Sequence, residues 1–126
     1  MKNILIISPL FGEWFPVTRL LRRLSYRVYI KPCSYSGFLS LRAMSFDLIL
    51  VGDELADMPG LEFVSRIRCR KVRKKIIYIS KNCLIEEKFK SESLGIDKYI
   101  HLSVSWVDFT ILIDRAIGGQ NDLCLN

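Results

Sequence analysis

Short apolar runs alternate with longer amphipathic stretches along nearly the whole chain. The predicted strands are residues 4–7, 27–30, 47–51, 75–79 and 97–102, and the predicted helices are residues 16–24, 36–44, 61–69, 84–94 and 105–117. Strands that alternate with helices in this way predict an α/β domain with helices on both faces of a parallel sheet. Because crossover connections are right-handed, the simplest arrangement is a doubly wound five-stranded sheet with strand order 2-1-3-4-5.

The spacing of apolar residues predicts which side of each helix faces the core. In the helix at residues 16–24, the residues at core spacing are Val17, Leu20, Leu21 and Leu24, and the apolar residues of the helix at residues 36–44 are Phe38, Leu39 and Leu41. Gly95 directly follows the helix at residues 84–94, in the position after a helix end that favours a positive φ.

The length of 126 residues suits one domain. We expect this domain to span residues 1–118, with residues 119–126 as a tail or the stub of a linker, because Gly118 and Gly119 break the last helix. No apolar run reaches the roughly 20 residues of a membrane-spanning helix. The apolar start lacks a small-residue cleavage site, which predicts a cytoplasmic location rather than secretion.

The cysteine and histidine residues do not form the pattern of a metal or cofactor site. The four cysteines lie at positions 33, 69, 83 and 124 without a C-x-x-C pair, and His101 is the single histidine. A metal site needs several such ligands at suitable spacing. We therefore expect no metal and no cofactor, and reduced thiols.

Two segments resemble the receiver domain of bacterial two-component response regulators, the CheY-like domain. Residues 46–62, which read FDLILVGDELADMPGLE, resemble its third strand and following loop, and residues 95–100, which read GIDKYI, resemble its Gly-Ala-Asp-x-Tyr segment. The resemblance covers about residues 2–117. It implies a flavodoxin-like fold and a role in two-component signalling.

The same resemblance implies a phosphorylation site whose charged positions are all altered here. The acidic pair that holds Mg²⁺ is replaced by Ser8 and Pro9, the phosphoacceptor aspartate by Gly52, and the lysine after strand five by Leu102. Mg²⁺ prefers hard anionic oxygens, and phosphoryl transfer depends on positioned charge. The resemblance therefore implies an atypical pseudo-receiver that is neither phosphorylated nor an enzyme.

Two positions match the resemblance. Ser80 fits the serine or threonine that senses the phosphoryl group, and Tyr99 fits the aromatic residue that moves inward or outward in the switch. Each also has an ordinary structural interpretation, because serine is common at a strand end and tyrosine suits a strand rim.

The neighbourhood of this site raises two further questions. Asp53, Glu54 and Asp57 could replace the lost carboxylate, but strand alternation directs Asp53 away from the position of residue 52, so we favour a solvated acidic loop. The apolar residues after the first strand are Leu10, Phe11, Trp14 and Phe15. They either fill the vacated pocket or form an exposed patch, and we favour filling.

Basic residues outnumber acidic ones by 19 to 13, and seven of them fall within residues 66–75. The predicted topology places two basic segments at the amino-terminal edge of the sheet: Arg22, Arg23, Arg27, Arg66, Arg68, Arg70, Lys71, Arg73, Lys74 and Lys75. They are either solvated loops that complement helix ends or a docking site for an anionic partner. We find no aromatic-interleaved platform and no helix-turn-helix pair in the sequence.

A second candidate surface combines the predicted helix 84–94, strand 97–102 and helix 105–117, the face through which receivers commonly bind partners or dimerise. It offers Glu86, Glu87, Lys88, Lys90, Glu92, Trp106 and Asp108. Mixed charge beside an aromatic residue suits a protein interface, although we favour a core position for Trp106.

Three functions follow from these observations. The first is a phosphorylation-independent pseudo-receiver that acts as a protein-interaction module in bacterial regulation, with another protein or a second copy as partner. The second is an adaptor that binds nucleic acid, an anionic lipid surface or another anionic partner. The third is a small-ligand-binding or enzymatic domain. The absence of a glycine-rich phosphate loop and of a Ser-His-Asp or Cys-His pattern argues against the third.

Overall fold

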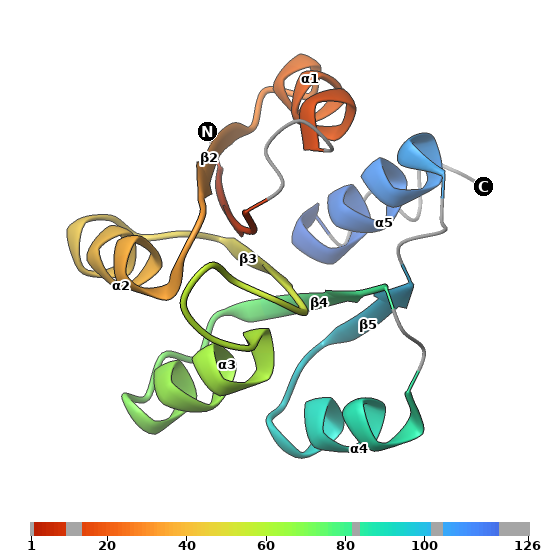
Figure 1. Cartoon of the computed structure of the whole chain (residues 1–126). Helices are drawn as coiled ribbons and strands as arrows, with labels where there is room; N and C mark the ends of the chain where they lie inside the picture. The colour runs from red at the N-terminus through yellow and green to blue at the C-terminus, as the bar shows by residue number, and fades with distance from the viewer. Residues whose placement is uncertain (1, 10–13, 82–83, 102–104, 119–126) are drawn as a thin grey trace.

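The computed structural model describes residues 2–9, 14–81, 84–101 and 105–118, and in these residues five strands alternate with five helices (Figure 1). The strands are β1 (Asn3–Ile7), β2 (Arg27–Lys31), β3 (Leu48–Gly52), β4 (Lys75–Ser80) and β5 (Lys98–His101). The helices are α1 (Phe15–Arg23), α2 (Ser34–Ala43), α3 (Gly60–Cys69), α4 (Ile85–Ser93) and α5 (Trp106–Gly118). No helix among these residues is long and apolar enough to span a membrane.

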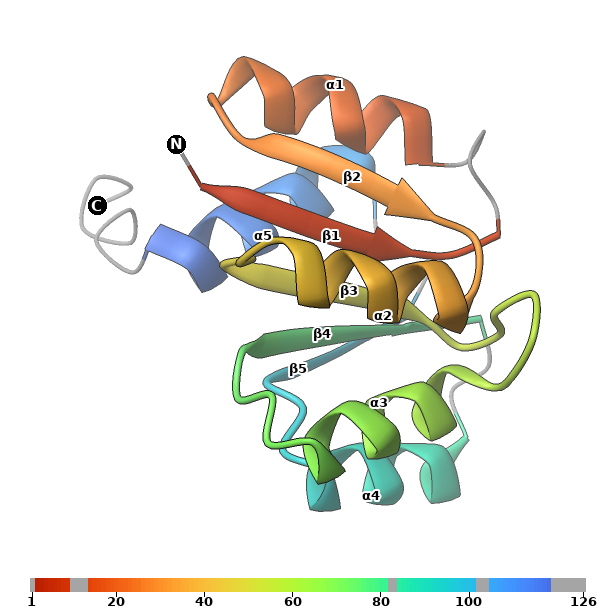
Figure 2. The same ribbon diagram turned by 90° about the vertical axis from the view of Figure 1, so that its left-hand side faces the viewer.

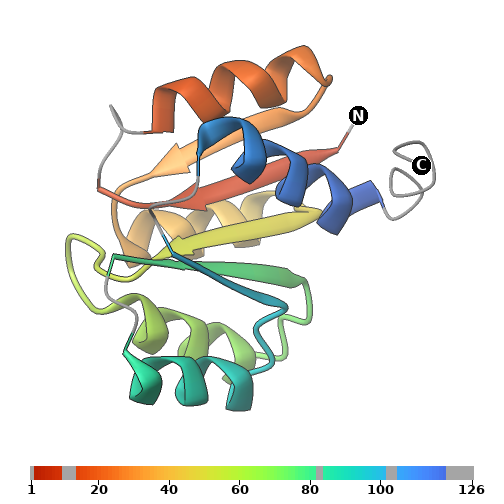
Figure 3. The ribbon, with the colours of Figure 1, turned by 90° about the vertical axis from the view of Figure 1, so that its right-hand side faces the viewer.

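The strands form one parallel sheet in the order β2-β1-β3-β4-β5, which confirms the predicted topology. Helices α1 and α5 cover one face of this sheet, and α2, α3 and α4 cover the other (Figures 2 and 3). All strands therefore begin at one edge of the sheet, the amino edge, and end at the opposite edge, the carboxyl edge. In Figure 2 the amino edge is on the left and the carboxyl edge is on the right.

Each face of the sheet contributes to its own apolar core. Ile4 and Ile6 of β1 belong to the core that includes residues of α1 and α5, whereas Leu5 and Ile7 belong to the core under α2, α3 and α4. Since successive side chains of a strand point to opposite faces, a strand covered on both faces must be apolar throughout. This requirement explains the continuous apolar runs of the central strands.

Three helices end in the same way at the amino edge. The residue after the C-cap has a positive φ in α1 (Ser25, 70°), α3 (Lys71, 64°) and α4 (Gly95, 73°). In each case its amide and the next amide donate to carbonyls of the last turn, which is the Schellman pattern. The sequence predicted only the glycine, because serine and lysine are not residues that normally favour this conformation.

The predicted boundaries differ from the observed ones by one or two residues, and the predicted core position of Leu24 was wrong. Leu24 lies beyond the end of α1 and is half exposed. Leu39, one of the apolar residues of α2, is also exposed. Helix α2 begins at Ser34 rather than at residue 36, because a carboxylate from a distant loop binds its first amides, as described below.

Candidate functional site

Three of the predicted site residues lie together at the carboxyl edge. Ser8 directly follows β1, Gly52 ends β3 and Ser80 ends β4, and these three strands are neighbours in the sheet. All three residues are buried. Pro9 is exposed beside them, and Leu102 lies outside the described residues. The cluster therefore contains the uncharged hydroxyl groups of Ser8 and Ser80, and Gly52 beside them has no side chain.

The backbone at Gly52 leaves room for a side chain. A Cβ atom there would lie 3.6 Å from the carbonyl oxygen of Ile7 and 3.7 Å from the Cβ and Oγ atoms of Ser8, which are ordinary van der Waals contacts. Packing does not require glycine at this position. The missing side chain is a property of the sequence and not a consequence of crowding.

Gly60, at the start of α3, is required by a close approach of two backbone segments. A Cβ atom at residue 60 would lie 1.9 Å from the carbonyl oxygen of Gly52. The loop after β3 folds back on the strand end, and the amide of Gly60 donates to the carbonyl of Asp53 at 2.8 Å. The sequence contains Gly60 in the segment that carries the receiver resemblance, but the reason for glycine there comes from the structure.

Asp53 connects the ends of two strands. Its Oδ2 atom accepts a hydrogen bond from the amide of Lys81, directly after β4, at 3.0 Å. The carbonyl of Lys81 lies 3.0 Å from Nε2 of His101 at the end of β5. The carboxylate of Asp53 thus binds a backbone amide on the β4 side of the sheet.

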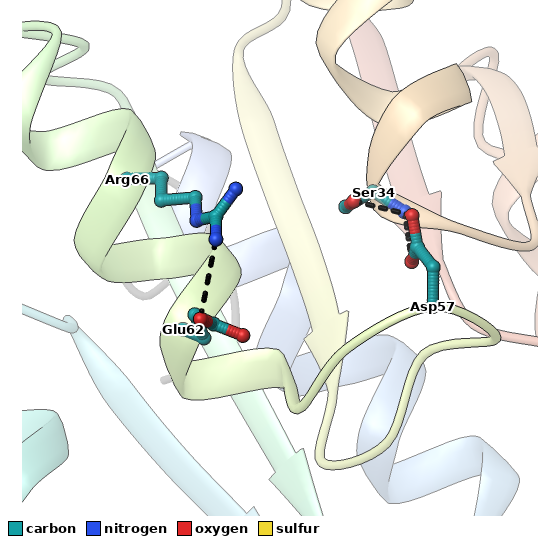
Figure 4. A network of polar contacts seen from close by, with 4 residues as sticks. All are labelled: Ser34, Asp57, Glu62 and Arg66. Atoms are coloured by element: carbon teal, nitrogen blue, oxygen red, sulfur yellow. Dashed lines mark hydrogen bonds and ion pairs between the residues drawn. The ribbon is translucent and has the colours of Figure 1, made fainter.

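The other two acidic residues of this loop are Asp57 and Glu54. Asp57 binds the start of α2: its carboxylate accepts from the Ser34 amide at 2.8 Å and the Ser34 hydroxyl at 2.5 Å (Figure 4). It also accepts from the Tyr35 amide at 3.3 Å. The Ser34 hydroxyl, together with these amides, lowers the pKa of the Asp57 carboxyl below its ordinary value. Glu54 is exposed. Asp57 is exposed as well, as expected of a solvated acidic loop, and Asp53 is partly exposed. The sequence did not predict that Asp53 and Asp57 also bind backbone amides of other segments.

Tyr99 belongs to a cluster between β4, β5 and α4. Its hydroxyl donates to Oε1 of Glu87 on α4 at 2.6 Å, and the Tyr78 hydroxyl lies 3.4 Å from Oε2 of the same carboxylate. The two tyrosine rings stack with centroids 5.7 Å apart. Burial, reinforced by the negative charges of Glu87 and Asp53, raises the pKa of Tyr78 far above its ordinary value. Sequence reasoning placed Glu87 on a surface and missed this role.

The apolar residues after β1 divide into two kinds. Trp14 is buried and packs its ring against Phe109 and Trp106 of α5, with centroids 5.6 and 6.3 Å away. Phe15, the next residue, is 62% exposed, and the Arg19 guanidinium lies over its ring. The favoured prediction that these residues fill the vacated pocket is wrong for Phe15, which is exposed. Leu10 and Phe11 lie outside the described residues.

Solved structures with the same architecture identify the fold. A CheY-like response regulator receiver domain protein from Methanospirillum hungatei JF-1 superposes with a TM-score of 0.86 at 24% identity, covering 97% of this chain and 98% of that one. The HemR receiver domain from Leptospira biflexa gives 0.86 at 19% identity, with 94% and 95% covered. This chain has the receiver-domain fold. The response regulator TrrA from Thermotoga maritima, whose structure is a complex with Mg²⁺-BeF, gives 0.79 at 19% identity, with 92% and 99% covered.

Sequence comparison alone finds no such relationship, since no family model and no curated protein matches this chain. On the receiver fold, the resemblance assigns the Mg²⁺-binding acidic pair to Ser8 and Pro9 and the phosphoacceptor to Gly52. These residues do not fit Mg²⁺, because together they supply one hydroxyl group and no carboxylate. Among the described residues, no three His, Cys, Asp or Glu side chains are grouped as metal ligands.

The receiver face formed by α4, β5 and α5 carries exposed apolar side chains. Leu84, Ile85 and Phe89 are exposed at and along α4. Val107 of α5 is also exposed, but it lines a hollow with Pro16, Arg19, Leu20 and Arg23 on the α1 side of that helix. Trp106 is half-buried and packs against the core, in agreement with the preferred interpretation of that residue. The sequence analysis named the charged residues of this face but not its exposed apolar residues. Their exposure depends on which side of each helix packs against the sheet.

The predicted basic residues lie at the amino edge, where the α1–β2 and α3–β4 connections are at the same end of the molecule (Figure 2). Several of them have structural partners. Arg66 pairs with Glu62 on α3 at 3.2 Å (Figure 4), and the Nζ atom of Lys75 donates to the Ala116 carbonyl at 2.6 Å. Arg22, Arg23 and Arg27 are exposed at the other connection.

Arg68 has the most extensive structural role among these basic residues. Its guanidinium donates to the carbonyls of Leu94 and Gly95 at the end of α4, and to those of Val72 and Lys74 before β4. All four distances are between 2.8 and 3.0 Å. Because these contacts occupy the guanidinium, the predicted role of Arg68 in binding an anionic partner gives way to a structural one.

Proposed function

We propose that this chain is a receiver-like module of two-component signalling that works without phosphorylation, through contacts with other proteins. One observation carries the proposal. Gly52 is buried next to Ser8 at the end of β3, where the resemblance places the phosphoacceptor and its metal ligands. A phosphoryl group needs a nucleophilic oxygen and positioned positive charge, and these two positions supply neither an acidic side chain nor a site for the metal.

The nearby carboxylates support this proposal because they already have other partners. Asp53 binds the Lys81 amide, and Asp57 binds the first amides of α2. In this arrangement a carboxylate of the chain itself connects the β3–α3 loop to the end of β4. We propose that this contact holds the β4–α4 region in one conformation without a phosphoryl group.

Treatment with acetyl phosphate, or with beryllofluoride, in the presence of Mg²⁺ is expected to leave the chain unmodified. Intact-protein mass spectrometry should show no phosphoryl adduct, and NMR signals of Tyr99 should not move on addition of beryllofluoride and Mg²⁺. A stoichiometric adduct on any acidic side chain would contradict the proposal.

The Gly52→Asp variant is the matched control for this experiment. The space around Gly52 admits a Cβ atom, so the variant should fold. It should still react poorly, because Ser8 and Pro9 offer no carboxylate for Mg²⁺. Efficient phosphorylation of Gly52→Asp would show that the aspartate alone was missing and that the rest of the site is functional.

The proposed contact surface is the α4–β5–α5 face, and the proposed partner is a second copy of the chain. Ile85 and Phe89 are 72% and 66% exposed and lie one helical turn apart on α4. Acidic and basic side chains of α4 lie beside them, as at the rim of a protein interface. An apolar centre with a charged rim is the arrangement of specific protein contacts.

Sedimentation equilibrium over a wide range of protein concentrations tests this surface. We expect the wild type to self-associate and the double variant Ile85→Glu/Phe89→Glu to be monomeric. Tyr35→Glu/Leu39→Glu is the control, since these α2 residues are also exposed and one turn apart but lie away from this face. A monomeric wild type, or equal disruption by both variants, would rule out the dimer.

A further inference from the structure

The amino edge has more positive charge than the fold uses. Every helix has a basic residue in its last turn, and all five helices end at this edge. Such residues complement helix dipoles, but that role does not need a further series of lysines and arginines in the loops. Two aspartates of this edge have partners within the chain: Asp47 accepts from the Asn3 amide, and Asp97 accepts from the Ile76 amide.

A groove runs along this edge between the end of α2 and the α3–β4 loop. Its volume is about 530 Å³, and its basic lining residues are Arg42 on one wall and Lys71, Arg73 and Lys74 on the other. A second hollow of about 390 Å³ shares Arg73 and Lys74 and extends toward the end of α4. We call the first hollow the amino-edge groove. Because the two hollows share Arg73 and Lys74, their cations follow one another along the edge.

The cations of the amino-edge groove are largely unpaired within the described residues. Arg42, Lys71 and Arg73 are exposed and form no hydrogen bond or ion pair through their side chains with the described part of the chain. Lys74 makes one contact, at 3.4 Å, with the Ser45 hydroxyl. These side chains can therefore bind an external anion without breaking contacts that the fold needs.

Lys71 occupies a backbone position that is unfavourable for it. Its φ is 64°, in the left-handed region where glycine is the usual residue after a helix end. A lysine at this position is strained relative to glycine, and it adds a cation to the groove wall. Strain that packing does not demand is a reason to look for a function at that residue.

A stacked pair at the helix ends adds a flat surface. The Arg70 guanidinium lies over the Phe38 ring at 4.6 Å from its centroid, which connects the end of α3 to α2. Arg70 is exposed and directly precedes Lys71 of the groove wall, although it does not itself line the groove. A guanidinium plane of this kind stacks on nucleobases, whereas an acidic peptide or a lipid headgroup has no comparable ring.

We propose that the amino-edge groove binds the phosphodiester backbone of a single-stranded nucleic acid without reading its sequence. Arg42, Lys71, Arg73 and Lys74 contact successive phosphates, and Arg70 stacks on a base. A groove with cations on both walls suits a thin, linear polyanion better than a flat membrane surface. Because the contacts are to phosphates, the affinity depends strongly on salt and little on base composition.

Fluorescence anisotropy with labelled oligo(dT) measures this binding directly. With about four phosphate contacts, the affinity should fall about 50-fold between about 50 mM and about 200 mM salt. The triple variant Arg42→Glu/Lys71→Glu/Arg73→Glu should bind more than about 100-fold more weakly at the lower salt concentration. The control Arg19→Glu/Lys31→Glu/Lys81→Glu makes the same change in net charge away from the groove and should weaken binding less than about tenfold.

A pair of glycine variants separates binding from folding. Lys71→Gly removes one cation and relieves the positive φ, so its melting temperature should rise while its affinity falls about 8-fold at about 50 mM salt. Ser25→Gly relieves the same backbone conformation at the end of α1 and removes no charge. It should be stabilised in the same way and bind like the wild type.

Three results would overturn the proposal. One is an absence of oligo(dT) binding by the wild type at the lower salt concentration. Another is equal weakening by the groove variant and its charge-matched control. The third is a wild type that does not bind oligo(dT) but binds another anionic probe. Binding of poly-glutamate would assign the groove to an acidic protein. Binding of vesicles of phosphatidylcholine with phosphatidylglycerol would assign it to a membrane surface.

Discussion

Replacing Gly60 with alanine is expected to lower the free energy of unfolding by roughly 3 kcal/mol or more. The new Cβ atom would lie 1.9 Å from the carbonyl oxygen of Gly52, and two backbone segments would have to separate to accommodate it. Alanine is otherwise the better helix former, so local propensity at the start of α3 would change stability in the opposite direction. Urea denaturation followed by circular dichroism measures the difference.

Gly52→Ala is the control on the other side of the same contact. Its Cβ atom would meet its nearest neighbours at 3.6 to 3.7 Å, so we expect stability to change by less than about 1 kcal/mol. Equal destabilisation by both variants would mean that the whole loop resists any added atom. A stable Gly60→Ala variant would contradict the close approach of the loop to the end of β3.

Replacing Trp14 with alanine is expected to lower the free energy of unfolding by about 3 to 5 kcal/mol. The side chain is 3% exposed and is part of the core between the sheet, α1 and α5, where its ring packs against two aromatic residues of α5. Its removal leaves a cavity that rigid neighbours cannot close completely. Circular dichroism is again the appropriate probe, because the substitution removes a fluorophore.

Phe15→Ala, one residue along the chain, should change stability by less than about 1 kcal/mol. Phe15 is mostly exposed and is contacted by the Arg19 guanidinium. Both substitutions remove a large aromatic side chain, and the two positions are adjacent. A difference in their loss of stability therefore reports the burial of Trp14 and not the size of the side chain removed. If both variants lost the same stability, the exposed position of Phe15 would be wrong.

The carboxyl edge of this receiver fold is held together by contacts within the chain. The contacts that fasten the β3–α3 loop are internal: the Gly60 amide to the Asp53 carbonyl, the Asp53 carboxylate to the Lys81 amide, and Asp57 to the start of α2. None of these contacts needs a phosphoryl group. This arrangement supports the proposed function.

The order of elements was predictable because it depends on local patterns. A strand covered by helices on both faces must be apolar at every position, and a helix at the surface must repeat its apolar residues every three or four positions. The runs at residues 4–7 and 47–51 therefore identified central strands, and the handedness of crossovers then limited the strand order. The position of Gly52 at the carboxyl edge followed from the same reasoning.

The partners of individual side chains were not predictable in this way. Nothing adjacent to Asp57 in the sequence indicates that it binds α2, 23 residues away, and nothing near Arg68 indicates that its partners include carbonyls at the end of α4. Such contacts depend on which loops the topology places side by side.

The sequence by itself determined the class of fold, the order of the strands and the absence of a carboxylate at residue 52, because side-chain periodicity and residue identity are local properties. The tertiary structure alone decided which charges the fold uses and which remain available. It placed Arg68 among four carbonyls and left Arg42, Lys71 and Arg73 exposed along one groove. The physical reason is that a charged group bonds to whatever the folded backbone brings within about 3 Å, and distance along the chain does not measure that proximity.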